Sequence, residues 1–165
     1  MTVKHEPAFQ ATGNVYHLSV DYERSVEGAA KKLSRLYLMN KDITSSNFPT
    51  RRKGTADVTM ELIQFNRSLS GDKVLDELEE LGYRPAELHE LFAFGDHYLE
   101  AQLRCTIVAL GSVWPDQRGY RKVPCLSRDS EFHEPELDLL GFDGRFGNGW
   151  LEVDQFAAVP QVASP

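Results

Sequence analysis

The sequence predicts an α+β fold in which helices pack on a mainly antiparallel sheet. Two observations support this prediction. Residues 14–100 contain both strand-like and helix-like segments, whereas the segments within residues 105–159 are all strand-like. Pro-Asp, Asp-Gly and Gly-rich turn signals separate the later segments, as is typical of short connections between strands. Helices segregated from a run of strands indicate an α+β domain with a strand-rich C-terminal half.

Length and composition predict one globular domain. The chain has 165 residues, of which 41% are hydrophobic and 26% charged, with a formal net charge of -7. This length is enough for a buried core. We expect a loose N-terminal segment at 1–13, a single domain at 14–160 and a tail at 161–165.

The first half shows a strand, a helix and a long loop. Residues 14–22 alternate in polarity and predict a strand. Ser25 is a plausible helix N-cap, and an apolar stripe at helical spacing follows it, formed by Val26, Ala29, Ala30, Leu33 and Leu36. Residues 40–54 contain Pro, Gly and small polar residues, which indicate a surface loop.

The middle of the chain predicts a second strand and two more helices. Residues 57–65 carry apolar side chains on both faces of a strand, so we expect cover on both sides. Ser70 is a plausible N-cap for a short helix that Gly82 ends. Pro85 suits the first position of the next helix. Strands are then predicted at 105–114, 120–126, 136–142 and 150–159.

Residues 85–100, PAELHELFAFGDHYLE, concentrate two histidines and several acidic residues. His89 and His97 are eight residues apart, which places them about 12 Å apart along a helix, too far to share a metal ion. Helical spacing instead predicts a buried stripe of Leu88, Leu91, Phe92, Leu99 and Phe94 or Gly95. The same spacing places in or near solvent Glu87, His89, Glu90, Asp96, His97 and Glu100.

The cysteines and the charge exclude several classes of protein. Cys105 and Cys125 form no CxxC pair and lie in strand-like runs, so we expect free buried thiols and neither a disulfide framework nor a zinc site. No apolar run approaches the ~20 residues of a membrane span, and a net negative charge disfavours direct nucleic-acid binding. We expect a cytoplasmic protein without a cofactor or metal. A Cys–His pair that uses His133 stays open, since partners can meet in space.

Aromatic residues in the strand-rich half predict a binding surface. Rings beside Gly, Pro and Asp turns are typical of protein or small-ligand surfaces, although core aromatics that anchor a small sheet give the same pattern. The basic run RGYRK at 118–122 could bind phosphate or an acidic partner, whereas the glycine-rich run at 141–149 lacks a phosphate-loop pattern. The candidate binding residues are Trp114, Tyr120, Arg121, Phe142, Phe146 and Trp150.

Three functions are open on these grounds. The first is a non-enzymatic binding module that presents the aromatic turns to a protein or small ligand. The second is an enzyme whose His, Cys and carboxylate groups assemble in space. The third is an acidic inhibitor that mimics nucleic acid, which requires carboxylates arrayed along one surface.

Several segments resemble a known family. The runs NKDITSSNFP, ELIQFNRSLSGDKVLDELEELGYRPAELHELFAFG and IVALGSVW, together with YRKVPCL, resemble a widespread family of uncharacterised bacterial proteins, over residues 14–145. That resemblance implies no activity. The segment GWLEVDQFAAVPQ departs from the ending of that family. The helix opened by GYRPAELHEL and the strands after it are also similar, in order alone, to C-type lectin-like domains. This likeness implies a ligand-facing surface at 111–150, without the calcium ligands of those domains.

Overall fold

The computed structural model describes residues 9–101 and 104–161. Within these ranges the chain forms three helices, α1 (Val26–Leu33), α2 (Gly71–Glu80) and α3 (Leu88–His97). The strands are β1 (Phe9–Asp21), β2 (Leu38–Met39), β3 (Thr55–Phe65), β4 (Tyr83–Pro85), β5 (Ile107–Val108), β6 (Trp114–Pro115), β7 (Arg121–Arg128), β8 (Pro135–Gly141) and β9 (Gln155–Pro160). The predicted α+β class is confirmed.

All the strands belong to one curved sheet. Its order is β1-β3-β9-β5-β7-β8-β2, with β4 added on β9 and β6 on β7. The longest pairing is antiparallel and joins β1 to β3, ending at Asp21 opposite Thr55. β5 pairs with β9 and β2 pairs with β8 in parallel, and the other pairs are antiparallel. β9 therefore lies inside the sheet and not at its edge.

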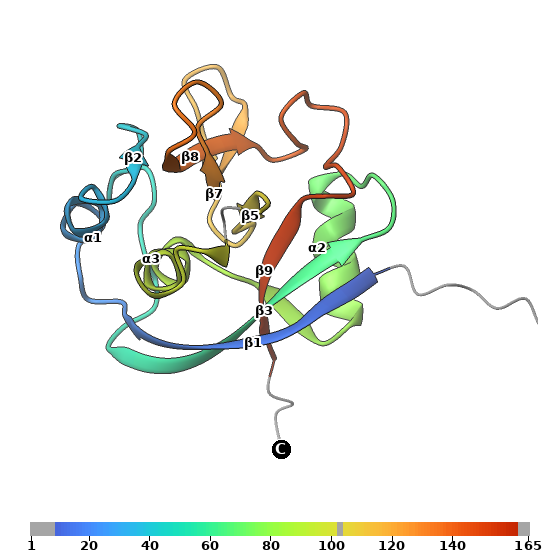
Figure 1. Ribbon diagram of the computed structural model, residues 1–165, viewed down its shortest axis with the longest axis horizontal. Helices are drawn as coiled ribbons and strands as arrows, with labels where there is room; N and C mark the ends of the chain where they lie inside the picture. Colours follow the sequence, from blue (N-terminus) through green and yellow to red (C-terminus); the bar gives the residue numbers. More distant parts are fainter. Residues whose placement is uncertain (1–8, 102–103, 162–165) are drawn as a thin grey trace, which may run out of the picture.

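Helices cover both faces of the sheet. In Figure 1, α3 lies between β1 and β3 below it and β7 and β8 above it, with α1 beside it, whereas α2 lies beyond β9. Neighbouring residues of a strand point to opposite faces. Met60 and Leu62 accordingly pack with α1 and α3, whereas Ile63 and Phe65 pack with α2. The prediction that this strand is covered on both sides is confirmed.

α1 and α2 begin at the polar N-caps that the sequence predicted. The side chains of Ser25 and Ser70 accept hydrogen bonds from the amides of Gly28 and Lys73, as N-caps do. Gly82 has a φ of 84° after α2, so the predicted stop is also confirmed. However, α1 ends at Leu33, and Leu36, predicted on its buried stripe, is 55% exposed.

Four predicted boundaries are wrong. β1 begins at Phe9, so residues 9–13 of the predicted loose segment are strand, and 1–8 lie outside the described residues. Pro85 ends β4 opposite Ala158 and does not open a helix. The predicted strand at 105–114 is divided into β5 and β6, and β9 begins five residues later than position 150. In each case pairing with a distant strand sets the boundary, and local residue preference does not.

The predicted solvent face of α3 is partly wrong as well. Glu90 is fully buried and His89 is 6% exposed. The curved sheet and α1 surround α3, so the side of the helix that carries these polar residues also meets protein. His89 Nε2 lies 2.7 Å from the carbonyl oxygen of Arg24, which can only accept, so Nε2 carries the proton.

Within residues 9–101 and 104–161, each helix is too short or too polar to cross a membrane. The cytoplasmic location inferred from the sequence stays a prediction.

Candidate functional site

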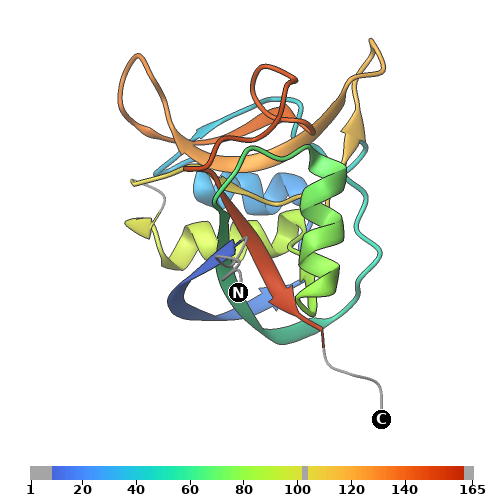
Figure 2. The same ribbon diagram turned by 90° about the vertical axis from the view of Figure 1, so that its right-hand side faces the viewer.

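Four of the six predicted binding residues gather at one surface groove, which we call the turn groove. It has a volume of about 430 Å³, and it lies between residues 119–122 and 141–147. Tyr120, Arg121 and Phe142 line it, and Phe146 lies between two further lining residues, Arg145 and Gly147. Figure 2 shows the two turns, gold and orange-red, above α2.

Strand pairing brings the two turns together. β7 and β8 are antiparallel, and Lys122 at the start of β7 is opposite Gly141 at the end of β8. The amide of Phe142 donates to the carbonyl of Arg121 at 2.9 Å, which extends the ladder by one step. The groove is therefore built on the end of a regular strand pair, which limits its movement.

Asp116 fixes the turn that carries Tyr120. Its carboxylate oxygen Oδ1 accepts hydrogen bonds from the amides of Arg118 and Tyr120, both at 2.9 Å. Gly119 has a φ of 84°, a conformation that glycine adopts without strain. The turn holds the Tyr120 ring outward, and this residue is 65% exposed.

Trp150 lies beneath the groove and is not on the surface. It is 1% exposed, and its indole Nε1 donates to the carbonyl oxygen of Phe142 at 2.8 Å. Phe142 is 3% exposed. Their prediction as surface residues is wrong, because the glycine-rich turn folds back and places both rings in the core beside α2. The turn needs its glycines, since a Cβ on Gly144 would lie 2.3 Å from the carbonyl oxygen of Gly149.

Arg121 is the central cation of the groove. Its guanidinium carbon lies 4.0 Å from the centre of the Phe142 ring, a cation–π contact, while 46% of the side chain stays exposed. Asp72 and Asp143 lie 3.8 Å and 4.0 Å from it, at the outer limit of an ion pair. Asp143 is itself held, because its Oδ1 accepts a hydrogen bond from the amide of Gly71 at 2.9 Å.

The groove carries more positive than negative charge. Arg121, Lys122 and Arg145 line it together with a single carboxylate, Asp143. This excess contrasts with the formal net charge of -7 of the chain. Lys122, Asp143 and Arg145 were not among the predicted binding residues, although the first belongs to the RGYRK run and the others to the glycine-rich run. The groove therefore has the chemistry of an anion-binding surface.

Trp114, the remaining predicted residue, lies next to the groove. It is partly buried and packs near Phe48, with ring centres 6.2 Å apart. It is also the cross-strand partner of Lys122. Its position supports the strand that leads into the groove.

The cysteines are poor nucleophiles in this environment. Burial, with a smaller effect of the Asp154 charge, raises the pKa of the Cys105 thiol to about 11. Burial also raises the pKa of Cys125 well above its ordinary range, and this residue is fully buried. Both thiols are free, and their hydrogen-bond acceptors are the carbonyls of Ala101 and Asp138. Their high pKa values oppose the thiolate that a Cys–His pair requires.

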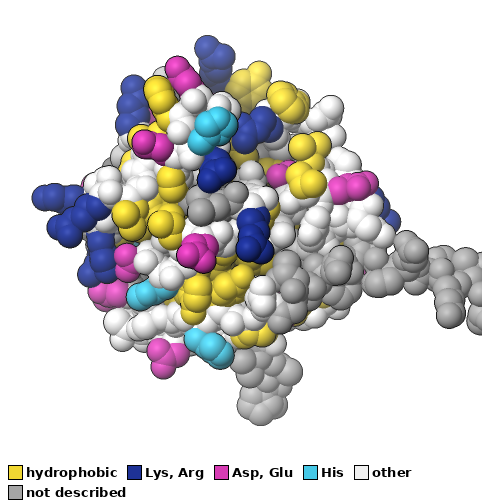
Figure 3. All heavy atoms as spheres, in the orientation of Figure 1, with side chains coloured by type: hydrophobic (Ala, Val, Ile, Leu, Met, Phe, Trp, Pro, Cys, Tyr) yellow, Lys and Arg dark blue, Asp and Glu magenta, His cyan; other side chains and the backbone are white. Residues whose placement is uncertain are grey.

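No three His, Cys, Asp or Glu side chains in the described ranges are close enough together to hold a metal ion. The face shown in Figure 3 carries acidic side chains interspersed with Lys, Arg and His, without a continuous row of carboxylates. That face therefore does not offer the array that a nucleic-acid mimic requires.

Comparisons with protein-family models, curated proteins and solved structures found no match. The resemblances to the uncharacterised bacterial family and to C-type lectin-like domains therefore stay predictions.

Proposed function

We propose that the protein is a binding module whose turn groove holds an acidic segment of a partner protein. The observation that carries this proposal is the Arg121 guanidinium, held over Phe142 at 4.0 Å with about half of its side chain open to solvent. A fixed guanidinium loses little conformational freedom when it pairs with a carboxylate, so more of the interaction energy is available for binding.

Charge and exposed rings favour a peptide as the occupant. Lys122 and Arg145 add positive charge to the same groove. Tyr120 and Phe146 are 65% and 77% exposed at its two turns. Aromatic residues and arginine are enriched at protein interfaces, where rings pack against apolar side chains and guanidinium groups pair with acids. Tyr120 lines the groove and Phe146 lies at its edge, and both rings are largely open to solvent, which suits an extended chain better than an enclosed small molecule.

A labelled peptide of alternating glutamate and tyrosine tests this proposal. Fluorescence anisotropy should show saturable binding that weakens as salt is raised, because exposed charges are screened. A matched peptide with glutamine in place of glutamate should bind at least tenfold more weakly. Equal binding of the two peptides would exclude the acidic ligand that we propose.

Matched variants locate the site of binding. Arg121→Ala should weaken binding about tenfold, the loss expected for one charged hydrogen bond. Arg118→Ala is the control, since Arg118 belongs to the same turn and does not line the groove. Tyr120→Ala should also weaken binding, whereas Phe132→Ala, with the same 65% exposure on another turn, should not. If each variant and its control bind alike, the peptide does not occupy the turn groove.

A further inference from the structure

A second cavity, larger than the turn groove, shares no lining residue with it, and we call it the tyrosine cavity. It has a volume of about 630 Å³ and lies at the C-terminal end of α3, next to β1, β3 and β9. Its wall includes Tyr16, Leu62, Tyr98, Arg104, Cys105 and Gln155. The volume is within the range of small-molecule sites. Because these residues come from separate segments, no local motif in the sequence marks the cavity.

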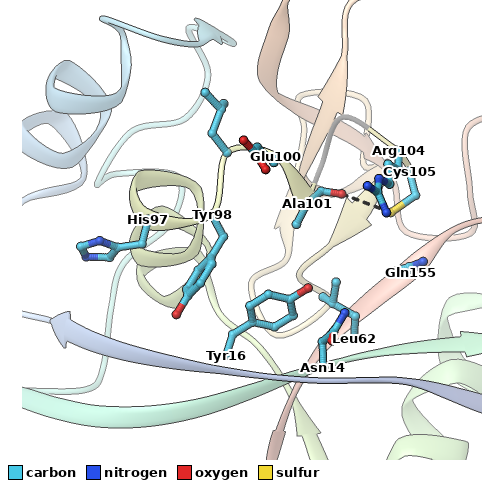
Figure 4. A pocket seen from close by; sticks show the side chains of 11 residues that line it. Asn14, Tyr16, Leu62, His97, Tyr98, Glu100, Ala101, Arg104, Cys105 and Gln155 are labelled. Carbon is cyan, nitrogen blue, oxygen red and sulfur yellow. Dashed lines mark hydrogen bonds between the residues drawn. The ribbon is translucent and has the colours of Figure 1, made fainter.

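One side of the cavity is apolar and rigid. The rings of Tyr16 and Tyr98 meet edge to face with their centres 4.8 Å apart, and Tyr16 makes a similar contact with Phe94 at 4.9 Å. Leu62 adds an aliphatic surface. A hydrogen bond also holds the Tyr98 ring in place, because its hydroxyl donates to the carbonyl of His17 at 3.3 Å. Figure 4 shows Tyr16, Tyr98 and Leu62 around one hollow, which suits a flat apolar group.

The other side of the cavity carries polar groups that lack partners among the described residues. Arg104 forms no ion pair within the described ranges, although Glu100 also lines the cavity. The Tyr16 hydroxyl likewise has no hydrogen bond to a described residue, and Figure 4 shows it directed into the hollow. In the same view Arg104 and Gln155 lie on one side of the hollow, away from Tyr98.

The position of this polar side is fixed by strand pairing. The amide of Gln155 donates to the carbonyl of Thr106 at 2.9 Å, and Gln155 pairs with Ile107 where β9 meets β5. These bonds tie the chain just after Arg104 to the start of β9. The cavity thus combines an apolar wall with Arg104, which lies two residues before the chain pairs with β9.

We infer that the tyrosine cavity binds a small aromatic carboxylate. Its ring would lie against Tyr16, Tyr98 and Leu62, and its carboxylate would pair with the guanidinium of Arg104. Arginine binds a carboxylate through two parallel hydrogen bonds, which fixes orientation as well as charge. The site does not depend on the proposed function of the turn groove, and either can fail without the other.

The test compares 3-phenylpropionate with 3-phenylpropanamide, which has nearly the same shape and no charge. Titration calorimetry should show saturable binding of the acid and at least tenfold weaker binding of the amide. Arg104→Gln should weaken binding of the acid about tenfold and leave the amide unchanged. Arg118→Gln, an exposed arginine outside the cavity, is the control and should change neither. Absence of saturable binding, or equal effects of the two substitutions, would overturn the inference.

Two further measurements separate binding from loss of structure. Tyr16→Phe removes one hydroxyl, keeps the ring and should weaken binding of the acid by a smaller factor. Cys105 lines the cavity, whereas Cys125 is fully buried. Bound 3-phenylpropionate should therefore slow alkylation of Cys105 by iodoacetamide, read by mass spectrometry of its peptide. Alkylation at an unchanged rate under saturating acid would place the ligand elsewhere and contradict the assignment.

Discussion

Arg84 holds the fully buried carboxylate of Glu90 through two hydrogen bonds, of 2.9 and 2.6 Å. The amide of Glu87 donates to Oε1 of the same carboxylate at 2.8 Å, and the Tyr22 hydroxyl donates to Oε2 at 2.7 Å. The carboxylate thereby joins β4, α3 and the residue after β1. Each of its oxygens has two donors, which is what a buried charge requires.

Glu90→Gln should lower the free energy of unfolding by about 3 kcal/mol, because it removes the main counter-charge of the half-buried Arg84, which then keeps only its 3.5 Å pair with Glu87. Urea denaturation at pH 7 measures this loss. Glu80→Gln, on the exposed end of α2, should change stability by less than about 0.5 kcal/mol. Similar losses in the two variants would mean that the buried ion pair contributes no more than a surface charge.

The same carboxylate should make stability depend on pH. Burial alone would raise the pKa of Glu90. The hydrogen bonds and positive charge of Arg84, together with hydrogen bonds from the Glu87 amide and the Tyr22 hydroxyl, hold that pKa below its ordinary value. Its contribution is therefore complete above the unfolded-state pKa of about 4.3, and it is lost as pH falls through the lower folded-state pKa. Glu90→Gln should flatten this part of the profile between pH 5 and pH 2. An unchanged slope would assign acid sensitivity to other groups.

Trp150→Phe should destabilise the protein by about 2 kcal/mol, because it removes the indole hydrogen bond to Phe142 and leaves a small cavity. Trp114→Phe is the matched control: Trp114 is partly buried, and its indole has no hydrogen bond to a described residue. Hydrogen exchange should show faster opening of residues 142–149 in the first variant. If the two variants have equal stability and exchange, Trp150 does not anchor the turn.

Gly71→Ala should destabilise the protein by about 2 kcal/mol through overpacking. A Cβ at this position would lie 2.3 Å from Cε1 of Phe142 and 2.4 Å from its carbonyl oxygen. Gly28→Ala, in the first turn of α1, is the control, because its Cβ would meet only the side chains of Ser25 and Arg24. Thermal unfolding of both variants should show a clear loss for the first and a change under about 1 kcal/mol for the second. A larger loss of stability for Gly28→Ala than for Gly71→Ala would contradict the close contact between Gly71 and Phe142.

The Cys105 thiol should react slowly in the native protein even at pH 9. With a pKa of about 11, roughly 1% of it is thiolate at pH 9, whereas an unfolded cysteine with a pKa near 8.5 is mostly thiolate. Iodoacetamide should therefore alkylate Cys105 much faster in urea than in the native state at pH 9. Asp154→Asn should speed the native reaction, since the Asp154 charge helps to raise this pKa. An unchanged rate would leave burial as the whole cause.

The sequence predicted features that depend on near neighbours. The caps at Ser25 and Ser70 are bonds to residues three positions away, and the two-sided burial of 57–65 follows from its own pattern. Glu90 could not be assigned in this way. Its partner Tyr22 is 68 positions away, and nothing within α3 shows that the curved sheet encloses the helix.

The sequence predicted only part of the turn groove, because burial of the other residues depends on contacts with distant segments. Tyr120, Arg121 and Phe146 are at turns and are exposed or half-exposed, as their neighbours suggested. Trp150 and Phe142 have similar neighbours but are buried, because the turn folds over the core beside α2. The sequence shows which aromatic residues lie near turns, whereas tertiary packing determines which of their rings face solvent.

The central place of β9 has a consequence for how the protein reaches its native state. β9 lies between β3 and β5 and also pairs with β4, so it joins the N-terminal strand pair to the strand-rich half. During synthesis the ribosome must release residues 155–160 before these parts can join. Until then one edge of β3 and one edge of β5 lack their partner, so the nascent chain depends on β9 to protect both halves from wrong pairing.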